Sequence, residues 1–318
     1  MKCPCCRKDN FREKYSNILG EDEKIYKIIE CKFCRFATLS PMPTEQDLTL
    51  FYTTGYSGRN TTNILEFDNP EDFLLTNKSV FEDMNARLLD IEIITNISNR
   101  GGRRLLDIGC GYGHGVYCAN SRGYIAEGID LNSESVTYGV KKLGLNLWIG
   151  SANNVKDKFD VVTQWMVLEH TLRPDEQVQA IYNCLNDKGV YAGSVPNIGG
   201  YYAKLKGRNW YNIVPPEHIN YFNHSNLRII LERSGFDILF LGTISRYASP
   251  SINFGIRTKL NNIISKTKNV MFKKILLGFY RFLTIVKRIF VYRLLNFIIV
   301  KFKLGGNGIF WVVQKNVK

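Results

Sequence analysis

The chain contains 318 residues, and its 45% hydrophobic and 13% aromatic content excludes an intrinsically disordered protein. No stretch approaches 18 uncharged apolar residues and the first residues do not resemble a secretory signal, so we expect a cytoplasmic protein without a membrane-spanning helix. The formal net charge is +13, but no acidic residue follows Asp237, so the excess of basic residues lies in the carboxyl-terminal region. Such a local excess of charge is informative about a binding partner and not about the fold.

Four of the eight cysteines form two Cys-x-x-Cys pairs near the amino terminus: Cys3, Cys6, Cys31 and Cys34. Two such pairs can supply the four thiolates of a tetrahedral zinc site, which then has no open position for catalysis. A reducing compartment favours metal binding over disulfide formation. The spacing therefore predicts a small structural zinc ribbon over residues 1–45, with a hairpin inside residues 10–30. Cys5 is an alternative ligand that could replace Cys3 or Cys6, although the Cys-x-x-Cys spacing favours Cys3 together with Cys6.

Residues 46–100 are expected to form a helical linker. Asn69-Pro70 has the composition of a helix start, because Asn can cap a helix and Pro is tolerated in its first turn. Apolar residues at helical spacing continue from Phe73 to about Ile97, and residues 99–102 should end the helical part.

From residue 103 onward, apolar runs alternate with helical segments. We expect strands at residues 104–108, 124–129, 145–149, 159–163, 189–194, 236–243 and 308–314. Strands that alternate with helices form mainly parallel, Rossmann-like sheets with right-handed crossovers. Ligands of such sheets bind at the carboxyl ends of the strands.

A glycine-rich turn follows the first of these strands, with glycines at positions 109, 111, 113 and 115. Such glycines let a ligand approach the backbone. The next strand ends near Asp130, whose carboxylate is placed to bind ribose hydroxyls. Asp107 distinguishes two cofactors, because its charge would repel the pyrophosphate of a dinucleotide but suits the ammonium and sulfonium groups of S-adenosylmethionine. The turn therefore favours S-adenosylmethionine.

Two segments resemble the class I S-adenosylmethionine-dependent methyltransferases. Residues 107–113 match the family's (Asp/Glu)-x-Gly-x-Gly-x-Gly motif, and residues 159–170 resemble its Phe-Asp-x-Val-x-x-x-x-Val-Leu-Glu-His pattern. The resemblance implies an α/β fold with a seven-stranded sheet whose last strand is antiparallel, formed by residues 101–254 and 304–318. A ribbon of the kind expected here precedes the methyltransferase domain in many bacterial methyltransferases of small molecules and sugars.

The resemblance also implies the cofactor-binding residues. The acid and glycines of the first motif hold the methionine end, the acid after the second strand holds the ribose, and the segment after the third strand contacts adenine. The full expected set is Asp107, Gly109, Cys110, Gly111, Gly113, Asp130, Leu131, Ser151, Ala152, Trp165 and His170. In related ribbon-bearing methyltransferases a Tyr-rich segment corresponding to residues 48–58 covers the cofactor, and a packed surface strap is the alternative here.

Methyl transfer from a sulfonium is an in-line displacement, for which a protein supplies alignment, water exclusion and, for some acceptors, a base. Glu217-His218-x-x-Tyr221-Phe resembles a loop of sugar C-methyltransferases in which a Glu-His pair serves the acceptor. His218 is our first candidate base, assisted by Glu217 or Tyr221, and His170 is the second. Alternatively, His218 pins its loop by a hydrogen bond, and His170 shapes a loop or lines the cofactor site.

Residues 255–303 are expected to form a basic amphipathic helical insertion before the last strand. Lys274, Arg281 and Arg288 recur every seven residues and share one helical face, while apolar residues cover other faces. This composition is typical of a helix at an anionic membrane surface. A helical lid or an oligomer interface is the alternative, and nucleic acid is the less favoured partner.

Together these features predict a methyltransferase that acts on a small molecule, favoured as a sugar or lipid-linked precursor of a surface glycan. The expected location is the cytoplasm, with peripheral contact to the inner face of the membrane. A quinone-like lipid methyltransferase and an RNA-binding modification protein are the alternative functions, and a non-catalytic S-adenosylmethionine-binding protein is a third.

Overall fold

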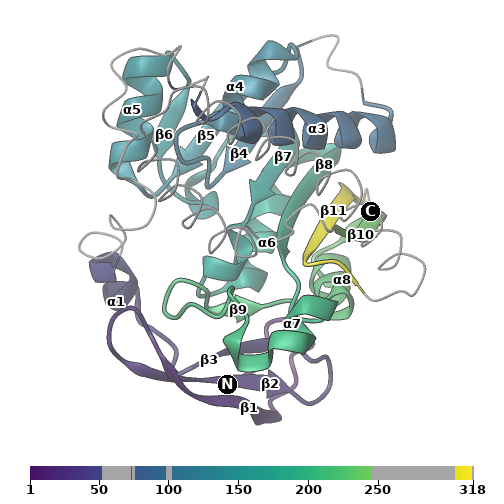
Figure 1. Cartoon of the computed structure of the whole chain (residues 1–318). Helices are drawn as coiled ribbons and strands as arrows, with labels where there is room; N and C mark the ends of the chain where they lie inside the picture. The colour runs from purple at the N-terminus through teal and green to yellow at the C-terminus, as the bar shows by residue number, and fades with distance from the viewer. Residues whose placement is uncertain (52–72, 74–75, 98–101, 245–304, 317–318) are drawn as a thin grey trace, which may run out of the picture.

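The computed structural model describes residues 1–51, 73, 76–97, 102–244 and 305–316. A large sheet forms the body of the protein, and a small sheet that begins near the amino terminus lies at one end of it (Figure 1). Most of the segment expected to cover the cofactor, the helix start at Asn69-Pro70 and the basic insertion at 255–303 lie outside the described residues. Within the described ranges, no helix is long and apolar enough to cross a bilayer.

The large sheet has seven strands in the order β10-β11-β8-β7-β4-β5-β6. The strands are β4 (Arg104–Ile108), β5 (Ile125–Asp130), β6 (Leu147–Ile149), β7 (Phe159–Trp165), β8 (Leu185–Pro196), β10 (Phe236–Ile244) and β11 (Gly308–Lys315). The strands from β8 to β6 pair in parallel, whereas β11 is antiparallel to both β8 and β10. The expected sheet and its antiparallel last strand are confirmed, and each strand lies within a few residues of its expected position.

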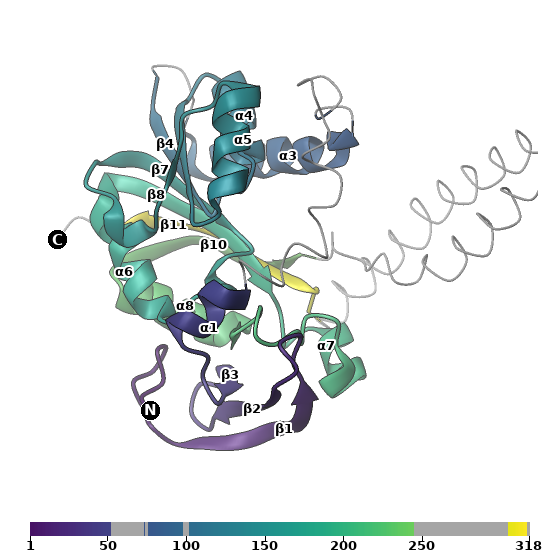
Figure 2. The same ribbon diagram turned by 90° about the vertical axis from the view of Figure 1, so that its left-hand side faces the viewer.

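Helices cover both faces of this sheet (Figure 2). The covering helices are α3 (Lys78–Thr95), α4 (His114–Ser121), α5 (Ser133–Leu143), α6 (Pro174–Cys184) and α8 (His224–Arg233). Two further short helices, α1 (Glu45–Leu50) and α7 (Tyr201–Lys206), lie away from the sheet. Successive side chains of a strand point to opposite faces. Leu105 accordingly packs with α3, α4 and α5, and Leu106 packs with α6 and α8.

The small sheet contains the predicted amino-terminal hairpin and two strands that we did not predict. Strands β1 (Phe11–Leu19) and β2 (Ile25–Cys31) form the antiparallel hairpin, and β3 (Ala37–Ser40) extends it. The fourth strand, β9 (Asn220–Tyr221), comes from a much later part of the sequence and pairs with β3. The ribbon sheet is therefore completed by the loop that carries the candidate base.

Candidate active site

The glycine-rich turn between β4 and α4 requires glycine on conformational and steric grounds. Gly109, Gly111 and Gly113 have φ angles of +70°, +52° and +87°, in the left-handed region that other residues rarely adopt. A Cβ atom on Gly109 would lie 2.3 Å from Cγ2 of Val167, and one on Gly113 would lie 2.5 Å from Cδ1 of Leu145. The turn therefore presents bare backbone at the carboxyl ends of the strands.

The carboxylate of Asp130, at the end of β5, holds this turn in place. Its Oδ2 atom accepts a hydrogen bond from the Gly111 N–H (2.7 Å), and its Oδ1 atom accepts one from the Asn132 N–H (2.8 Å). The N–H of Gly150, just beyond β6, donates to the Asp130 carbonyl at 3.0 Å. Each carboxylate oxygen has a second lone pair, so the group can also accept hydrogen bonds from two adjacent ribose hydroxyls.

Asp107 lies in β4 directly below the turn and is 3% exposed. The Thr163 hydroxyl donates to its Oδ1 atom at 2.6 Å. A Cβ atom on Gly115 would lie 2.4 Å from Oδ2, so the carboxyl group occupies the space above that glycine. Burial raises the pKa of Asp107 to about 7 and the charge of Asp130 adds to the increase, while the Thr163 hydrogen bond and the charge of Arg87 oppose it. A cation bound at the turn would stabilise the ionised form.

Arg87, on α3, is a site residue that the sequence analysis missed. It is 5% exposed, its Nη2 atom lies 2.6 Å from the Asp83 carboxylate, and its Nη1 donates to the Ser194 hydroxyl at 3.1 Å. Its guanidinium lies 4.8 Å from the ring centroid of Trp165, which stacks on Phe310. An arginine on the apolar face of a helix was the available signal, since a buried cation needs partners.

The other members of the expected cofactor set lie along the same edge of the sheet. Cys110 is buried within the glycine turn, and Leu131, directly after β5, is 76% exposed. Ser151 caps the 3-10 turn η3 (Ala152–Asn154) that follows β6, and Ala152 is buried. The turn and the ends of β4, β5 and β6 therefore fit a cofactor with a ribose and an ammonium group.

A second group of polar side chains follows β7: Glu169, His170 and His218. Glu169 and His170 belong to the 3-10 turn η4 (Leu168–His170), and His218 belongs to the segment 212–223, which we call the acceptor loop. The two imidazole rings pack edge to face with their centroids 4.8 Å apart, and Nε2 of His170 lies 3.9 Å from Oε1 of Glu169. The structure thus brings both candidate bases together with a carboxyl group that was not in the expected set.

Backbone carbonyls fix the tautomers of both histidines. Nδ1 of His170 hydrogen-bonds to the carbonyl of Glu217, and Nδ1 of His218 hydrogen-bonds to that of Asn212, each at 2.8 Å. Because a carbonyl only accepts, both Nδ1 atoms carry the proton and the Nε2 atoms carry the lone pair in the neutral rings. Burial lowers the pKa of His170 to about 4, although the Glu217 and Met166 carbonyls oppose the decrease.

Glu169 is 1% exposed, and neither of its carboxylate oxygens has a hydrogen-bond partner among the described residues. Burial raises its pKa to about 8, and the charge of Glu217 adds to the increase. Tyr221 is also buried, and its hydroxyl donates to the His218 carbonyl at 2.9 Å. Tyr221 therefore holds the backbone of the acceptor loop in this structure.

The ribbon anchors the acceptor loop to the body of the protein. Strand β3 pairs with β9, and the Thr38 hydroxyl donates to the Ile219 carbonyl at 3.1 Å. The N–H of the same Ile219 donates to the Glu169 carbonyl at 2.9 Å. A two-residue strand is too short to produce a periodic pattern, so the sequence alone could not show that β3 holds this loop.

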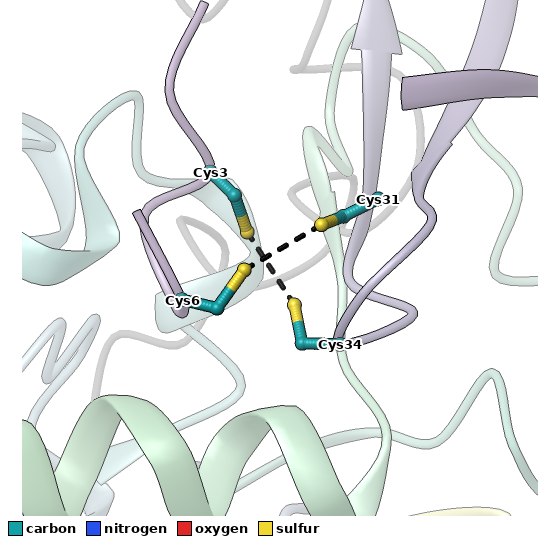
Figure 3. Close-up of side chains that lie close together, drawn as sticks. All are labelled: Cys3, Cys6, Cys31 and Cys34. Atoms are coloured by element: carbon teal, nitrogen blue, oxygen red, sulfur yellow. Dashed lines mark hydrogen bonds between the residues drawn. The ribbon is translucent and has the colours of Figure 1, made fainter. Parts of the chain in front are cut away.

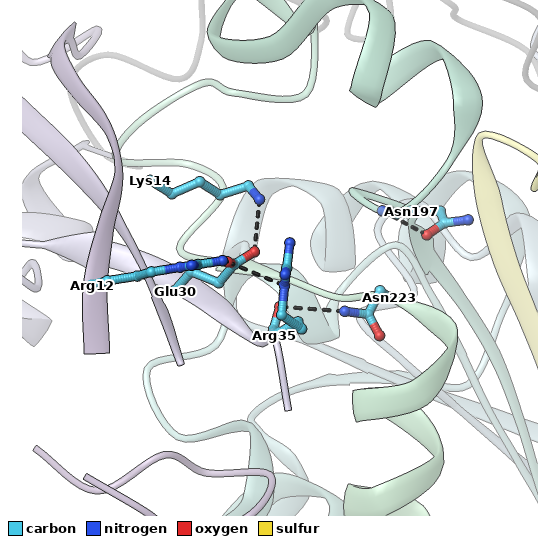
Figure 4. A network of polar contacts seen from close by, with 7 residues as sticks. Arg12, Lys14, Glu30, Arg35, Asn197 and Asn223 are labelled. Carbon is cyan, nitrogen blue, oxygen red and sulfur yellow. Dashed lines mark hydrogen bonds and ion pairs between the residues drawn. The ribbon is translucent and has the colours of Figure 1, made fainter. Parts of the chain in front are cut away.

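A group of basic side chains lies on the ribbon beside the acceptor loop (Figure 4). The buried carboxylate of Glu30 pairs with Arg12 (2.8 Å), Lys14 (2.7 Å) and Arg35 (3.2 Å). The side-chain amide of Asn223 donates to the Arg35 carbonyl at 3.3 Å. Three cations around one carboxylate leave a local excess of positive charge at this interface.

The four cysteines of the two Cys-x-x-Cys pairs converge at the base of the ribbon, with their sulfurs pointing toward one another (Figure 3). The Sγ atoms of Cys3 and Cys34 are 3.4 Å apart, and those of Cys6 and Cys31 are 3.6 Å apart. Zn–S bonds of about 2.3 Å in a tetrahedron require S–S separations of roughly 3.8 Å, so the cluster fits a zinc ion with small movements. Cys5 is buried nearby but does not belong to this set.

A family model described as a methyltransferase domain matches residues 80–240, just over half of the chain. None of the curated proteins compared with the sequence matches it. Among solved structures, an S-adenosylmethionine-dependent methyltransferase from Archaeoglobus fulgidus is 20% identical, with 76% of this chain and 99% of that chain covered and a TM-score of 0.46. Phosphoethanolamine N-methyltransferase 2 from Haemonchus contortus is 17% identical, with coverages of 73% and 53% and a TM-score of 0.46.

The matched span includes the glycine turn, Asp130, η4 and the acceptor loop. The sheet has the seven strands and the antiparallel last strand that the resemblance implied. The chain therefore belongs to the class I S-adenosylmethionine-dependent methyltransferases.

Proposed function

We propose that this enzyme methylates a small-molecule acceptor bound between the glycine turn and the acceptor loop, and that the acceptor is a sugar or a lipid-linked precursor of a surface glycan. The observation that carries the proposal is the pair His170 and His218, each with its Nδ1 proton fixed on a backbone carbonyl. A neutral imidazole that carries its lone pair on Nε2 suits an acceptor that must lose a proton.

S-adenosylmethionine, when bound, supplies a methyl group on a sulfonium. Asp107 would bind the ammonium group, and Asp130 would bind the ribose hydroxyls while holding Gly111. His218 would accept the proton of the acceptor at Nε2, with His170 packed against its ring. His218 is buried, which limits the access of water to its ring.

The basic group on the ribbon supports an acceptor that carries phosphate. Arg12, Lys14 and Arg35 exceed the charge of Glu30 and lie next to the acceptor loop. Sugars are activated in glycan synthesis as phosphate esters of nucleotides or lipids, and Arg and Lys are the usual partners of phosphate. The cysteine cluster would hold a structural zinc ion that stabilises the ribbon and through it the loop.

Mass spectrometry of envelope glycans and lipid-linked sugars, with and without this protein in its cells, tests the acceptor class. We expect one glycan component to lose the mass increment of a single methyl group in cells without the protein, and the same loss in cells with His218→Ala. A change confined to quinones or to RNA would replace the proposed acceptor.

Contact with an anionic membrane through residues 255–303 belongs to the same proposal and rests on their sequence alone. Sedimentation with vesicles of neutral and anionic lipid tests it. Equal recovery of the protein with both kinds of vesicle would remove the membrane from the proposal.

A further inference from the structure

A basic surface with exposed apolar side chains lies between β8 and the acceptor loop. It is formed by residues 201–211, which comprise α7, the 3-10 turn η5 (Gly207–Asn209) and the two residues after it, and we call it the α7 face. Its exposed basic side chains are Lys204, Lys206 and Arg208. No acidic residue occurs between Asp187 and Glu217, so the segment itself carries only positive charge.

The apolar side chains of the α7 face are exposed although the helix is firmly packed. Ala203 is buried in the cluster that joins α7 to the ribbon hairpin. Tyr201, Lys204 and Leu205 occupy positions i, i+3 and i+4, which share one side of a helix. Tyr201 is 43% exposed, Leu205 is 63% exposed and Tyr211 is 38% exposed. Exposed apolar groups gathered on a fixed element are typical of a surface that binds a partner.

We propose that the α7 face docks on an anionic membrane surface and thereby presents the acceptor loop to a lipid-linked acceptor. Basic side chains are attracted to anionic headgroups, and leucine and tyrosine side chains partition into the boundary between headgroups and acyl chains. The inference rests on the proposed function for the class of acceptor, and it selects the lipid-linked form.

The connections to the basic segment 255–303 support a membrane as the partner of this face. Ile244, the last described residue before the segment, pairs with Gly308. Gly305, the first described residue after it, accepts a hydrogen bond from the Tyr201 N–H at 3.2 Å, so both connections lie near the start of α7 (Figure 2). The segment contains no acidic residue, so its charge repels the lysines of the α7 face, whereas an anionic surface attracts both.

The composition of the α7 face favours a bilayer over two other partners. Nucleic acid would be attracted by the same cations, but it binds through aromatic rings that stack on bases, and the most exposed apolar side chain here is the aliphatic Leu205. A second copy of the chain in a symmetric contact would bring the same positive charges together. Anionic lipid matches both the charge and the leucine.

The α7 face is directly connected to the acceptor side of the active site. Tyr211 is followed by Asn212, the first residue of the acceptor loop, whose carbonyl hydrogen-bonds to Nδ1 of His218 at 2.8 Å. A face that contacts the bilayer one residue before this loop places the loop at the membrane surface. A sugar on a lipid carrier is held at that surface, whereas a soluble sugar nucleotide is not.

Sedimentation of the full-length protein with vesicles of phosphatidylcholine, alone or mixed with phosphatidylglycerol, tests the charges of the face. Lys204→Gln/Lys206→Gln should weaken binding to the anionic vesicles by at least about tenfold, because each cation near such a surface contributes roughly fivefold. Lys141→Gln/Lys142→Gln is the matched control. It removes two exposed lysines from the end of α5, far from α7 in Figure 1, and should bind like the unmodified protein.

A second pair of variants tests the apolar contribution. Leu205→Ser should weaken binding to the anionic vesicles by at least about fivefold, because the serine buries no apolar surface in the bilayer boundary. Ile93→Ser is its control, since Ile93 lies on α3 and is similarly exposed, at 69%. Thermal melting and S-adenosylmethionine binding verify that each variant is folded.

The inference is overturned if the unmodified protein ignores anionic lipid or if either α7 variant binds the vesicles as its control does. If the lysine variant instead loses affinity for a mixed-sequence RNA while Leu205→Ser sediments like its control, nucleic acid replaces the membrane. Variants that bind like their controls, in a protein that methylates a lipid-linked sugar, would refute only this inference. Vesicle binding through the α7 face, in cells whose envelope sugars do not change when the protein is removed, would refute only the proposed acceptor.

Discussion

The ionisation of Asp107 should control the affinity for S-adenosylmethionine. Burial raises its pKa to about 7, so a large fraction of the free protein carries a neutral acid near neutral pH. Binding of an ammonium group beside it requires the ionised form, so cofactor binding should release a proton. Affinity should therefore increase as the pH rises through 7 and level off above it.

The size of the effect follows from a single group with this pKa. Between about pH 7.5 and pH 5.5 the affinity should fall about 25-fold, and at about pH 6.5 binding should release roughly three-quarters of a proton. Burial lowers the pKa of the nearby His114 to about 4, so His114 remains neutral throughout this range. Burial of Asp107 sets the midpoint together with the Thr163 hydrogen bond and the charges of Asp130 and Arg87.

Isothermal titration calorimetry in buffers of different ionisation enthalpy measures both the affinity and the proton release. Asp107→Asn provides the comparison, because its amide cannot ionise and its affinity should be low and independent of pH. Equal affinities of the unmodified protein at the two pH values, or proton release that persists in the variant, would refute the reasoning.

Asp107→Asn, which should weaken cofactor binding, should stabilise the folded protein when no cofactor is bound. An acid whose pKa is raised by folding binds more protons in the folded state, so the free energy of unfolding decreases as the pH rises from about 4 to about 7. The full difference above neutral pH is on the order of 4 kcal/mol. We expect Asp107→Asn without cofactor to be more stable than the unmodified protein at about pH 8 and to lose that advantage near pH 4.

Three further predictions concern the turn, the ribbon and α3. Gly109→Ala should lower the free energy of unfolding by about 1–3 kcal/mol in urea, because its Cβ would overlap Val167, and an unchanged midpoint would contradict this. Cys34→Ser should speed amide hydrogen exchange in the acceptor loop and reduce turnover while cofactor affinity stays within about twofold, since β9 pairs with the ribbon. Arg87→Met should raise the pH midpoint of cofactor affinity, because the arginine charge lowers the pKa of Asp107, and a midpoint that stays or falls would exclude that electrostatic role.

The cofactor half of the site could be predicted from the sequence because its determinants are local. Asp107 and the glycines that follow it lie on one strand and one turn, and Asp130 ends the next strand in the sheet. In a parallel sheet the carboxyl ends of successive strands share one edge, so order along the chain gives proximity in space. The resemblance of residues 159–170 to the family pattern extended that prediction to Trp165 and His170.

The acceptor half could be predicted only in part because its contacts join distant segments. His218 was identified as a candidate base, but its place beside His170 depends on the hydrogen bond between Ile219 and Glu169, 50 positions apart in the numbering. Glu169 stood next to a candidate base without any sign that its carboxyl group would be buried beside both imidazoles. The position of Arg87 on the apolar face of its helix could have marked it as buried, but not its contact with Trp165, which lies far from it in the sequence.

This division has a consequence for how the two substrates are recognised. The large sheet and its turns build the cofactor half, whereas the acceptor loop is held from the ribbon side by the pairing of β3 with β9 and the bond from Thr38 to Ile219, and from the other side by η4. Changes in the ribbon should therefore alter the acceptor side and leave the cofactor side intact. Because the same Ile219 bonds to Glu169, a displacement of β3 is transmitted to the carboxyl group that faces both histidines. The ribbon is in this sense part of the acceptor site, although none of its cysteines lies there.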